Sequence, residues 1–255
     1  MHQVLSITSR DNSLLKGIRQ LVRDPAGYRK QGQVWVEGDH LVRAALVRGY
    51  RPKVVVFSDE KWPSALSLYG FEDIKLVVVS ELLMRELSAL EMPTTLGCLF
   101  DLPPMANVKP DTATVVLDRV QDAGNVGSIL RCAAAFGYGQ VLSLKGTAAL
   151  WASKTLRAGM GAHFGLHMVE GLSEAALDAL NTPLVVTSSH VGEWLHHANL
   201  PWPCAWVMGH EGQGVSASLQ ARAAHHIRIA QPGGEESLNV AAAAAICLYA
   251  TAAKP

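Results

Sequence analysis

The sequence is poor in cysteine and contains no long hydrophobic run. Its four cysteines are widely spaced and form no CxxC pair, which argues against a disulfide framework or zinc site and predicts small buried side chains in a reducing compartment. The longest apolar stretch, residues 240–253, is too short and too rich in alanine to span a bilayer, which takes ~20 residues. The first residues lack the apolar core of a signal peptide. We therefore expect a cytoplasmic protein without a membrane span.

Charge is also scarce. Charged residues make up 17% of the chain and their formal sum is zero, which argues against bulk affinity for polyanions. The distribution is uneven, because residues 1–53 hold ten Lys and Arg against four Asp and Glu. A basic segment on a neutral protein indicates an anionic partner such as nucleic acid, although a solvated helix face explains it equally well. The candidates for phosphate contact are Lys16, Arg19, Arg23 and Arg29.

The usual signatures of nucleotide and metal sites are missing. The segment 124–127 lacks the GxGxxG spacing of a dinucleotide site, and the chain has no GxxxxGK[ST] loop. This argues against a nucleotide-dependent enzyme such as an oxidoreductase. No carboxylate or cysteine stands at ligand spacing around the histidines, so we expect no metal. The histidines considered are His196, His197, His210, His225 and His226.

In the first part of the chain, strand patterns alternate with helix patterns, which predicts a small α/β/α layer structure. The basic residues of the first 30 positions accompany an apolar face, so we expect a helix there. The expected helices are 4–30, 39–48, 61–69 and 81–87, and the expected strands are 34–36, 54–57, 75–79 and 96–100.

A polar run with three prolines, residues 101–111, separates the two halves of the chain. Because proline stiffens and interrupts regular structure, this run is the best linker candidate. We expect a first domain over residues 1–102, a linker over 103–111 and a second domain over 112–255.

The second half again alternates strands and helices, which predicts a parallel sheet that binds ligands at the carboxyl ends of its strands. The expected strands are 114–118, 141–144, 166–169, 184–187, 205–208 and 227–229. The expected helices are 128–136, 153–158, 173–180, one that Ser216 caps, and an alanine-rich one over 240–253.

Three glycine-bearing loops, 118–131, 209–216 and 229–239, each follow an expected strand and precede a helix. In a parallel sheet they leave at one edge, which favours a ligand pocket over three separate connectors. The last loop reads as a strand end followed by a turn and the start of a helix. Glu235, Glu236 and Ser237 favour that helix start. Arg131 stands in apolar helix sequence, so its charge faces the site or an anion, or forms a structural salt bridge to Asp118 or Glu211. The polar side chains of the loops are Asn125, Arg131, Glu211, Ser237 and Asn239.

Three segments, LDRVQDAGNVGSILRCAAAFG, VMGHEGQGVS and IAQPGGEESLNVAAAAAI, resemble the three motifs of the SpoU/TrmH-like RNA ribose 2′-O-methyltransferases in order and spacing. These enzymes belong to the SPOUT superfamily, and the resemblance covers roughly residues 112–255. The N-terminal patterns SITSRDNSLLKGIRQL and QVWVEGDHLVRAAL resemble the L30e-like substrate-binding domain of the ribosomal-RNA members.

The resemblance implies an α/β SPOUT domain with a parallel sheet and a C-terminal trefoil knot, S-adenosylmethionine as cofactor, and a homodimer formed through the knotted domain. It implies RNA as substrate, ribosomal RNA in preference to transfer RNA. Arg157 joins the candidates for RNA contact. Catalytic positions would be Asn125, Arg131, Glu211, Ser237 and Asn239, and cofactor positions Ser188, Gly209, Ile229 and Leu238.

This sequence departs from the family pattern in three places. Ala123 stands where the first motif usually has proline, Ala230 and Gln231 replace a frequent Pro-Met, and Gly159 stands where serine is frequent. These positions affect the shape of loops and RNA contact, and they leave the polar set intact.

The resemblance assigns Arg131 as the base that removes the 2′-OH proton, although a guanidinium normally stays protonated. Two roles therefore stay open: deprotonation after desolvation, or anchoring of the adjacent phosphate while another group accepts the proton. Ser237 and Asn239 would orient the ribose or Arg131, and Glu211 would brace the loop or the arginine. The alternatives to an rRNA methyltransferase are a tRNA ribose methyltransferase and a non-catalytic RNA-binding protein.

Overall fold

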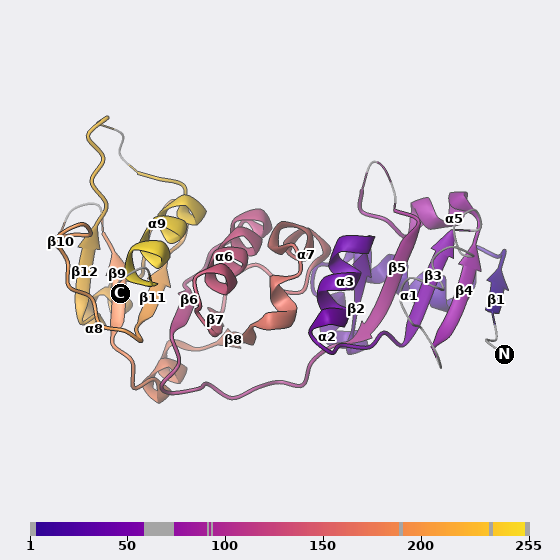
Figure 1. The fold of residues 1–255 in the computed structure, drawn as a ribbon, viewed down its shortest axis with the longest axis horizontal. Helices are drawn as coiled ribbons and strands as arrows, with labels where there is room; N and C mark the ends of the chain where they lie inside the picture. The colour runs from indigo at the N-terminus through magenta and orange to yellow at the C-terminus, as the bar shows by residue number, and fades with distance from the viewer. Residues whose placement is uncertain are drawn as a thin grey trace. The chain divides into compact units, whose positions relative to one another are not determined.

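The computed structural model describes residues 4–58, 74–90, 92, 94–188, 191–234 and 237–252. The chain forms two compact units (Figure 1). The first comprises residues 1–104 together with 151–164, and the second comprises residues 105–150 and 165–255. Within the described residues, no helix is both long and apolar enough to cross a membrane. The domain boundaries at residues 102 and 112 stay a prediction.

The first unit is built on a five-stranded mixed sheet in the order β1-β4-β3-β5-β2. β1, β4 and β3 run parallel, whereas β5 is antiparallel to both β3 and β2. The strands are β1 (Val4–Ile7), β2 (Gln33–Glu37), β3 (Val54–Ser58), β4 (Lys75–Val79) and β5 (Leu96–Asp101), and the helices are α1 (Ser13–Arg23), α2 (Gly27–Gln31), α3 (Asp39–Val47) and α5 (Glu81–Glu86).

The single helix predicted over residues 4–30 is wrong. Residues 4–7 form the edge strand β1 beside β4, and α1 begins only after Asn12, whose Oδ1 accepts a hydrogen bond from the Leu14 amide at 2.9 Å. The expected apolar face of α1 is confirmed, because Leu15, Ile18 and Leu21 are buried. The helix predicted over 61–69 lies outside the described residues.

A segment from the second half of the sequence packs into the first unit. Residues 151–164 contain α7 (Ser153–Gly159) and the start of the 3-10 helix η1 (Ala162–Gly165). The Phe164 ring lies 5.0 Å from the Tyr50 ring and 5.8 Å from the Phe100 ring, and Arg157 Nη1 donates to the Ala89 carbonyl at 2.8 Å. These contacts explain why the segment belongs to the first unit.

The second unit contains a seven-stranded sheet in the order β10-β12-β9-β11-β6-β7-β8, and every pair in it is parallel. The predicted parallel sheet is therefore confirmed. Its strands are β6 (Thr114–Leu117), β7 (Gln140–Leu144), β8 (His167–Leu172), β9 (Leu184–Thr187), β10 (Glu193–Trp194), β11 (Ala205–Met208) and β12 (His225–Arg228), and its helices are α6 (Ala123–Ala135), η2 (Glu174–Ala179), α8 (Ala217–Arg222) and α9 (Val240–Ala252).

The alanine-rich helix α9 is fixed to the centre of this sheet. Trp206 of β11 is fully buried, and its Nε1 donates to Thr251 Oγ1 of α9 at 3.1 Å. α9 packs beside α6, where the rings of Phe136 and Tyr249 lie 5.7 Å apart (Figure 1). Small alanine side chains let the helix approach its neighbours closely, so one side of α9 is buried. Its N-terminal end, which Asn239 caps, holds the third motif at the sheet edge.

Four details of this unit differ from the sequence prediction. α6 begins at Ala123 and not at 128, because Asp122 caps it by accepting a hydrogen bond from the Asn125 amide at 2.8 Å. Residues 174–179 form a 3-10 helix, and the two-residue strand β10 was not predicted. The cap of α9 is Asn239 and not Ser237, since Asn239 Oδ1 accepts from the amides of residues 241 and 242.

Burial of the cysteines agrees with the sequence prediction. All four are free thiols, and three of them, Cys98, Cys204 and Cys247, are buried. Burial raises the pKa of the Cys204 thiol to about 11, so the group stays protonated near neutral pH. The three buried cysteines therefore act as small core side chains.

Candidate active site

Four neighbouring strands of the second sheet end on one level. The register pairs Met208 with Leu117, Val207 with Val186, and Ile227 with Thr187. The residues that follow, Asp118, Gly209, Ser188 and Arg228, therefore form one row at the carboxyl edge of β6, β11, β9 and β12. The three loops singled out in the sequence leave from this edge, as a parallel sheet requires.

Hydrogen bonds connect polar side chains of all three loops. Asn125, in the first turn of α6, lies at the centre of the group. Its Nδ2 donates to Glu211 Oε1 at 3.1 Å, and its Oδ1 accepts from Asn239 Nδ2 at 3.0 Å. These side chains are 86 and 114 residues from Asn125 in sequence. The structure thus brings three of the five predicted catalytic residues into direct contact.

Glu211 is held by three donors from the first loop. Its two carboxylate oxygens accept from the backbone amides of Gln121 and Asp122, both at 3.0 Å, in addition to Asn125. Partial burial by itself would raise the pKa of Glu211, but the hydrogen bonds from these groups outweigh it and lower the pKa to about 2. Glu211 is therefore a carboxylate at any pH near neutrality and a weak base. Its geometry is that of a brace between two loops.

Replacing Glu211 with glutamine should flatten the acid limb of the stability profile. The folded-state pKa of about 2 lies below the pKa of ~4.3 for an unfolded glutamate. The carboxylate therefore stabilises the native state fully above pH ~4.3 and loses this effect as the pH falls through about 2. Urea unfolding at several pH values between these limits should give a steeper loss of stability for the native protein than for Glu211→Gln. The exposed Glu193→Gln is the matched control, and equal slopes in the native protein and Glu211→Gln would contradict this role.

Asp118 and Arg119 form a second link between the first two loops. Asp118, with 1% of its side chain exposed, binds Arg119 Nε through Oδ1 at 2.8 Å and accepts from the Ser216 amide through Oδ2 at 2.7 Å. Arg119 Nη1 donates to Gln213 Oε1 at 2.9 Å. Arg119 has a φ of 59°, which is unusual for a residue other than glycine and marks local strain.

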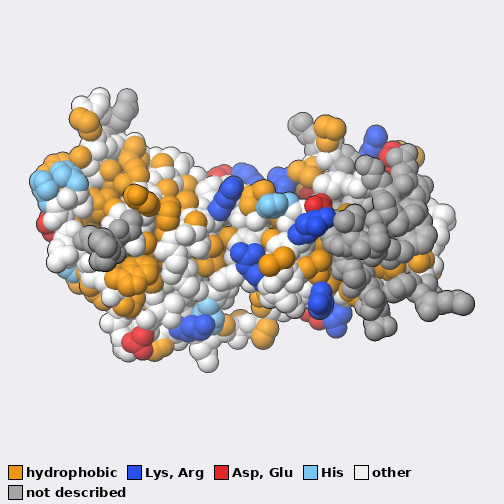
Figure 2. All heavy atoms as spheres, viewed as in Figure 1, with side chains coloured by type: hydrophobic (Ala, Val, Ile, Leu, Met, Phe, Trp, Pro, Cys, Tyr) orange, Lys and Arg blue, Asp and Glu red, His pale blue; other side chains and the backbone are white. Residues whose placement is uncertain are grey.

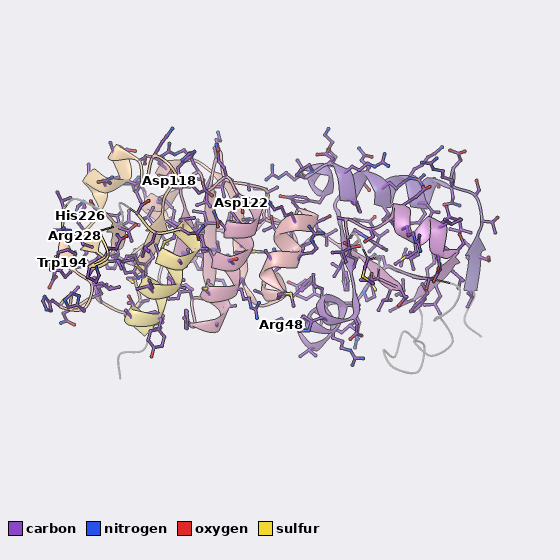
Figure 3. The ribbon with its side chains drawn as sticks, turned by 90° about the horizontal axis from the view of Figure 1, so that it is seen from above. Arg48, Asp118, Asp122, Trp194, His226 and Arg228 are labelled. Carbon is purple, nitrogen blue, oxygen red and sulfur yellow. The ribbon has the colours of Figure 1, made fainter. Side chains whose placement is uncertain are left out.

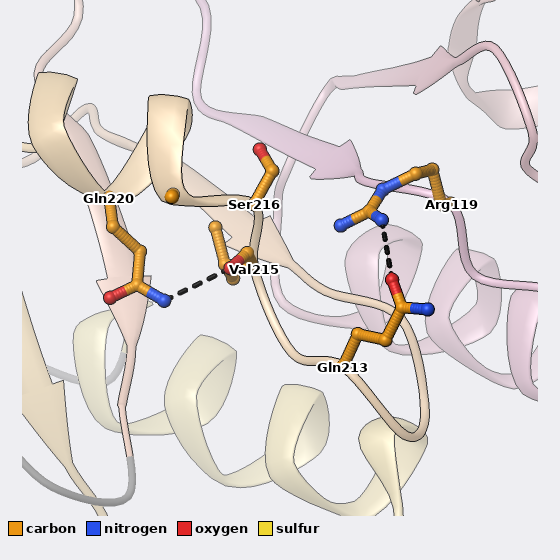
Figure 4. Close-up of a pocket in the computed structure, with 6 residues that line it drawn as sticks. Arg119, Gln213, Val215, Ser216 and Gln220 are labelled. Carbon is orange, nitrogen blue, oxygen red and sulfur yellow. Dashed lines mark hydrogen bonds between the residues drawn. The ribbon is translucent and has the colours of Figure 1, made fainter.

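From the sequence, Asp118 was expected only as a partner for Arg131, and Arg119 was not among the predicted site residues. An aspartate that directly follows an all-apolar strand was the available signal, because a carboxylate so close to a core requires partners. An open depression of about 550 Å³ lies at this link, and Figure 4 shows the Arg119 and Gln213 side chains that line it. Its lining residues are Arg119, Gln213, Val215, Ser216, Ala217 and Gln220.

Arg131 is exposed on α6, six positions after Asn125. Among the residues that the structure describes, no ion pair joins it to Asp118 or Glu211. Asp118 pairs with Arg119 instead, and Glu211 is held by the first loop. The alternative of a structural salt bridge to either carboxylate is therefore wrong. Ser237 is exposed two residues before Asn239 and is not part of the Asn125 group.

The predicted cofactor positions lie along the row of strand ends. Gly209 is buried, and a Cβ there would collide with the backbone of Gly214 and Val215, so this turn requires glycine. Ser188 Oγ accepts from the Val191 amide at 3.2 Å. Ile229 directly follows β12, and Leu238 is 38% exposed.

The same loop carries an acceptor that was not among the predicted site residues. Gln231 Oε1 is buried, and within the described ranges it has no hydrogen-bond partner. A buried acceptor without a donor is costly, so Gln231 Oε1 is a candidate contact for a bound group. It stands between Ile229 and Leu238 in the sequence.

The predicted RNA contacts of the first unit divide into two kinds. Arg19 is a correction: its side chain is only 11% exposed, and it binds Glu86 at 2.8 Å and the Arg10 carbonyl at 2.5 Å, so it holds the fold together. Lys16 pairs with Asp11 at 2.9 Å on the surface. The remaining candidates are Arg23, which is exposed, Arg29, which lies over the Tyr28 ring, and Arg157, which binds the Ala89 carbonyl.

A metal site is not evident in this part of the molecule. No group of three or more His, Cys, Asp or Glu residues that could hold a metal ion occurs in the described part of the chain. His210, close to the Asn125 group, uses Nδ1 to accept from the amides of Gly212 and Gln213. It shapes the second loop.

Comparison with known proteins identifies the family. The model of the SpoU rRNA methylase family matches residues 112–249, which is more than half of the chain and includes all three loops. The chain belongs to the SpoU rRNA methylase family. A model of the MRM3-like substrate-binding domain matches residues 12–97.

Two relatives match most of this chain. An uncharacterised tRNA/rRNA methyltransferase of Synechocystis is 30% identical over 96% of this chain and 93% of its own length. The 23S rRNA (guanosine(2553)-2′-O)-methyltransferase RlmP of Bacillus subtilis is 32% identical over 84% of this chain and 86% of its own length. The chain spans only 40% of the length of another match, the mitochondrial rRNA methyltransferase 3 of Mus musculus.

A solved structure shares this α/β fold. The AdoMet-bound rRNA methyltransferase from Sinorhizobium meliloti superimposes with a TM-score of 0.85 at 25% identity, covering 97% of each chain. The mixed sheet of the first unit and the parallel sheet of the second therefore share the fold of that rRNA methyltransferase.

Proposed function

We propose that this protein transfers a methyl group from S-adenosylmethionine to a ribose 2′-hydroxyl of ribosomal RNA. One observation carries the proposal: Asn125 joins Glu211 and Asn239, so one polar group at the carboxyl edge of a parallel sheet contains a side chain from each SpoU motif. The RlmP relative methylates a 2′-oxygen of 23S rRNA according to its name. A cytoplasmic location, the compartment expected from the sequence, belongs to the same proposal.

The residues at the sheet edge fit the methyl donor. Backbone groups at Gly209 and Ile229, the exposed Leu238 side chain and the unpartnered Gln231 Oε1 offer an apolar surface with hydrogen-bonding groups around it. Ser188 closes the row between them. When bound, S-adenosylmethionine supplies a methyl group that its sulfonium has already activated. The protein then needs chiefly to align the ribose oxygen, to within ~3–3.5 Å of the methyl carbon.

Glu211 is excluded as the proton acceptor by its surroundings. Three donors hold its carboxylate and lower its pKa to about 2, so it takes up a proton only in strong acid. Its role in the proposal is to keep the second loop in place against Asn125. Asn239 fixes the other side of Asn125 and at the same time caps α9.

Arg131 places a positive charge on α6, six positions after Asn125. Its guanidinium is exposed, and within the described chain it has no ion pair to Asp118 or Glu211. It is therefore available to an RNA phosphate. In the proposal Arg131 anchors the phosphate next to the target ribose, or accepts the 2′-OH proton once the bound RNA and cofactor desolvate it. Ser237 orients the ribose from the third loop.

The first unit is proposed to hold the RNA. Its match to a substrate-binding domain model and the basic surplus of the first 53 residues support this role. The exposed Arg23 is the best phosphate contact, because Lys16 shares its charge with Asp11 and Arg19 is committed to Glu86. We keep the domain boundaries at 102 and 112, the L30e-like character of the first domain and the C-terminal knot as parts of the proposal.

A homodimer through α9 and α6 belongs to the proposal as well. Ile246 and Tyr249 of α9 are 41% and 60% exposed, and Figure 2 shows hydrophobic side chains gathered over this helix. An exposed apolar patch of this kind marks a protein interface. Sedimentation at micromolar concentration should give twice the mass of the chain, because pairing removes this patch from water. A single species of monomer mass would contradict the dimer.

Loss of one modification in cells would test the function. Ribose methylation should be mapped across ribosomal and transfer RNA from cells with and without the protein. We expect one 2′-O-methylated position of ribosomal RNA to disappear. Loss at a transfer RNA position instead would reassign the substrate, and an unchanged map would contradict the proposed activity.

A further inference from the structure

An aromatic and cationic cluster occupies the outer end of the same row of strand ends. Trp194 of β10 lies opposite Arg228 of β12, and the Arg228 guanidinium lies 4.0 Å from the centre of the Trp194 ring. The His196 ring lies 6.4 Å from the Trp194 ring at an interplanar angle of 29°, and the His197 ring lies 4.1 Å from the His196 ring. Figure 3 shows Trp194, His226 and Arg228 grouped at one end of the second unit. We call Trp194, His196, His197 and Arg228 the Trp194 cluster.

The Trp194 cluster lies at the same height along the strands as the predicted cofactor positions. Trp194 pairs with Arg228, and Arg228 stands on the level of Ser188 and Gly209 by the register of β12, β9 and β11. Three strand spacings, roughly 14 Å, separate Trp194 from Gly209 across the sheet. A chain that crosses the proposed methyl-transfer site can therefore reach the cluster with a neighbouring nucleotide.

The composition of the cluster fits a nucleic acid better than a protein. Of the exposed aromatic residues that the structure describes, Trp202 contacts the Tyr138 ring and Tyr249 contacts the Phe136 ring. Their neighbours are thus aromatic and apolar. Trp194, which is 36% exposed, instead has a guanidinium and an imidazole as neighbours. Trp, His and Arg side chains are the groups on which unstacked bases commonly stack.

The electrostatics of the cluster support an anionic chain. Arg228 has no ion pair among the described residues, and its buried Nε has no hydrogen-bond partner. Alternation along β10 directs the neighbouring Glu193 side chain to the opposite face of the sheet. Of the charged residues in β10 and β12, only Arg228 thus shares a face with Trp194. Figure 2 shows histidine side chains gathered at this end of the second unit.

We propose that the Trp194 cluster is a stacking platform for a base of single-stranded RNA that flanks the methylated nucleotide. This inference rests on the proposed function, because it assigns a second RNA contact to the same sheet edge. Arg228 fixes the orientation of the Trp194 ring from one face. His196 and His197 are exposed beside this ring, where a base can join the cluster.

Binding of a labelled 12-nucleotide oligouridylate to the full chain, measured by fluorescence anisotropy, tests the platform. Trp194→Ala should raise the Kd by roughly 5- to 100-fold, because base stacking on one aromatic ring is worth this much. Trp194→Phe should stay within about threefold of the native protein, since it keeps a stacking ring. Trp202→Ala is the matched control and should bind as the native protein does.

Turnover distinguishes a platform from a structural role. With ribosomal RNA as substrate, Trp194→Ala should raise KM for RNA and leave kcat unchanged, because the contact lies away from the reacting atoms. If Trp194→Ala does not fold, the double variant of the exposed His196→Ala and His197→Ala takes its place, with a rise in Kd of at least about threefold expected.

Several results would overturn the platform. They are failure of the native protein to bind the oligonucleotide, an unchanged Kd in the alanine variants, and an equal loss in Trp202→Ala. In each case binding of S-adenosylmethionine and methyl transfer by the native protein decide separately whether the proposed function stands. A native protein that neither binds the cofactor nor methylates RNA would contradict the function itself.

Discussion

Replacing Arg131 with alanine should lower methyl transfer by roughly 10²- to 10⁴-fold, the range typical of a group that handles a proton or a transition-state charge. Affinity for S-adenosylmethionine should change by less than about threefold, because Arg131 stands on α6 and not among the strand ends that would hold the cofactor. Its exposed position, without a carboxylate partner in the described chain, gives it no evident role in stability. The measurements are single-turnover methylation of ribosomal RNA and calorimetric titration with the cofactor.

Two further variants, one conservative and one a control, show how the loss in Arg131→Ala arises. Arg131→Lys keeps the positive charge, so partial recovery would favour the phosphate anchor over a role specific to guanidinium. Arg222→Ala removes an arginine of the same unit that pairs with Asp178 at 2.6 Å, and it should remain active. Full activity of Arg131→Ala would remove Arg131 from the mechanism.

Replacing Asp118 with alanine should lower the free energy of unfolding by about 3 kcal/mol, since it leaves an arginine and a partly buried amide without their acceptor. The Asp118 side chain is 1% exposed and binds both Arg119 and the Ser216 amide, while Arg119 in turn binds Gln213. Because Ser216 and Gln213 belong to the second loop, methyl transfer should fall as well. Urea unfolding and turnover at a temperature where the variant is folded measure the two effects.

The matched control for this prediction is Asp178→Ala. The Asp178 side chain is 72% exposed and also pairs with an arginine, Arg222. An exposed ion pair contributes only about 0–1 kcal/mol, so this variant should unfold close to the native protein. Equal losses in Asp118→Ala and Asp178→Ala would show that burial of Asp118 does not matter.

Much of the sheet in the second unit could be predicted from the sequence. The strands 184–187 and 205–208 were predicted with the bounds that they have in the structure. Such strands are buried on both faces, so they read as short continuous apolar runs between turn signals. Their alternation with helices then dictates the parallel arrangement and the common edge for the loops.

Other features depend on contacts that a linear pattern does not contain. β1 is four residues long and is stabilised by pairing with β4, more than 65 positions away, so its local pattern merged with the helix that follows. The start of α6 was misplaced because two glycines disguised its first turns, while the decisive bond runs from the Asn125 amide to Asp122. The burial of Arg19 follows from Glu86, which stands in another helix.

The candidate site was predicted as a set of residues, and its arrangement was not. The family motifs pointed to Asn125, Glu211 and Asn239, but only the fold shows that Asn125 bonds to both of the others. The motifs gave no indication of the link through Asp118 and Arg119 or of the unpartnered Gln231 Oε1. Such features arise where segments distant in sequence meet, and side-chain partners there are set by three-dimensional packing.

The most direct test of the central claim uses purified protein, S-adenosylmethionine labelled in its methyl group and unmodified ribosomal RNA transcripts. After alkaline hydrolysis, we expect the label in one alkali-resistant dinucleotide, because a methylated 2′-oxygen cannot attack the adjacent phosphate. Glu211→Ala, which releases the loop held against Gln121, Asp122 and Asn125, should reduce that signal. Label recovered on a base, or none transferred by protein that binds the cofactor, would contradict ribose methylation at this sheet edge.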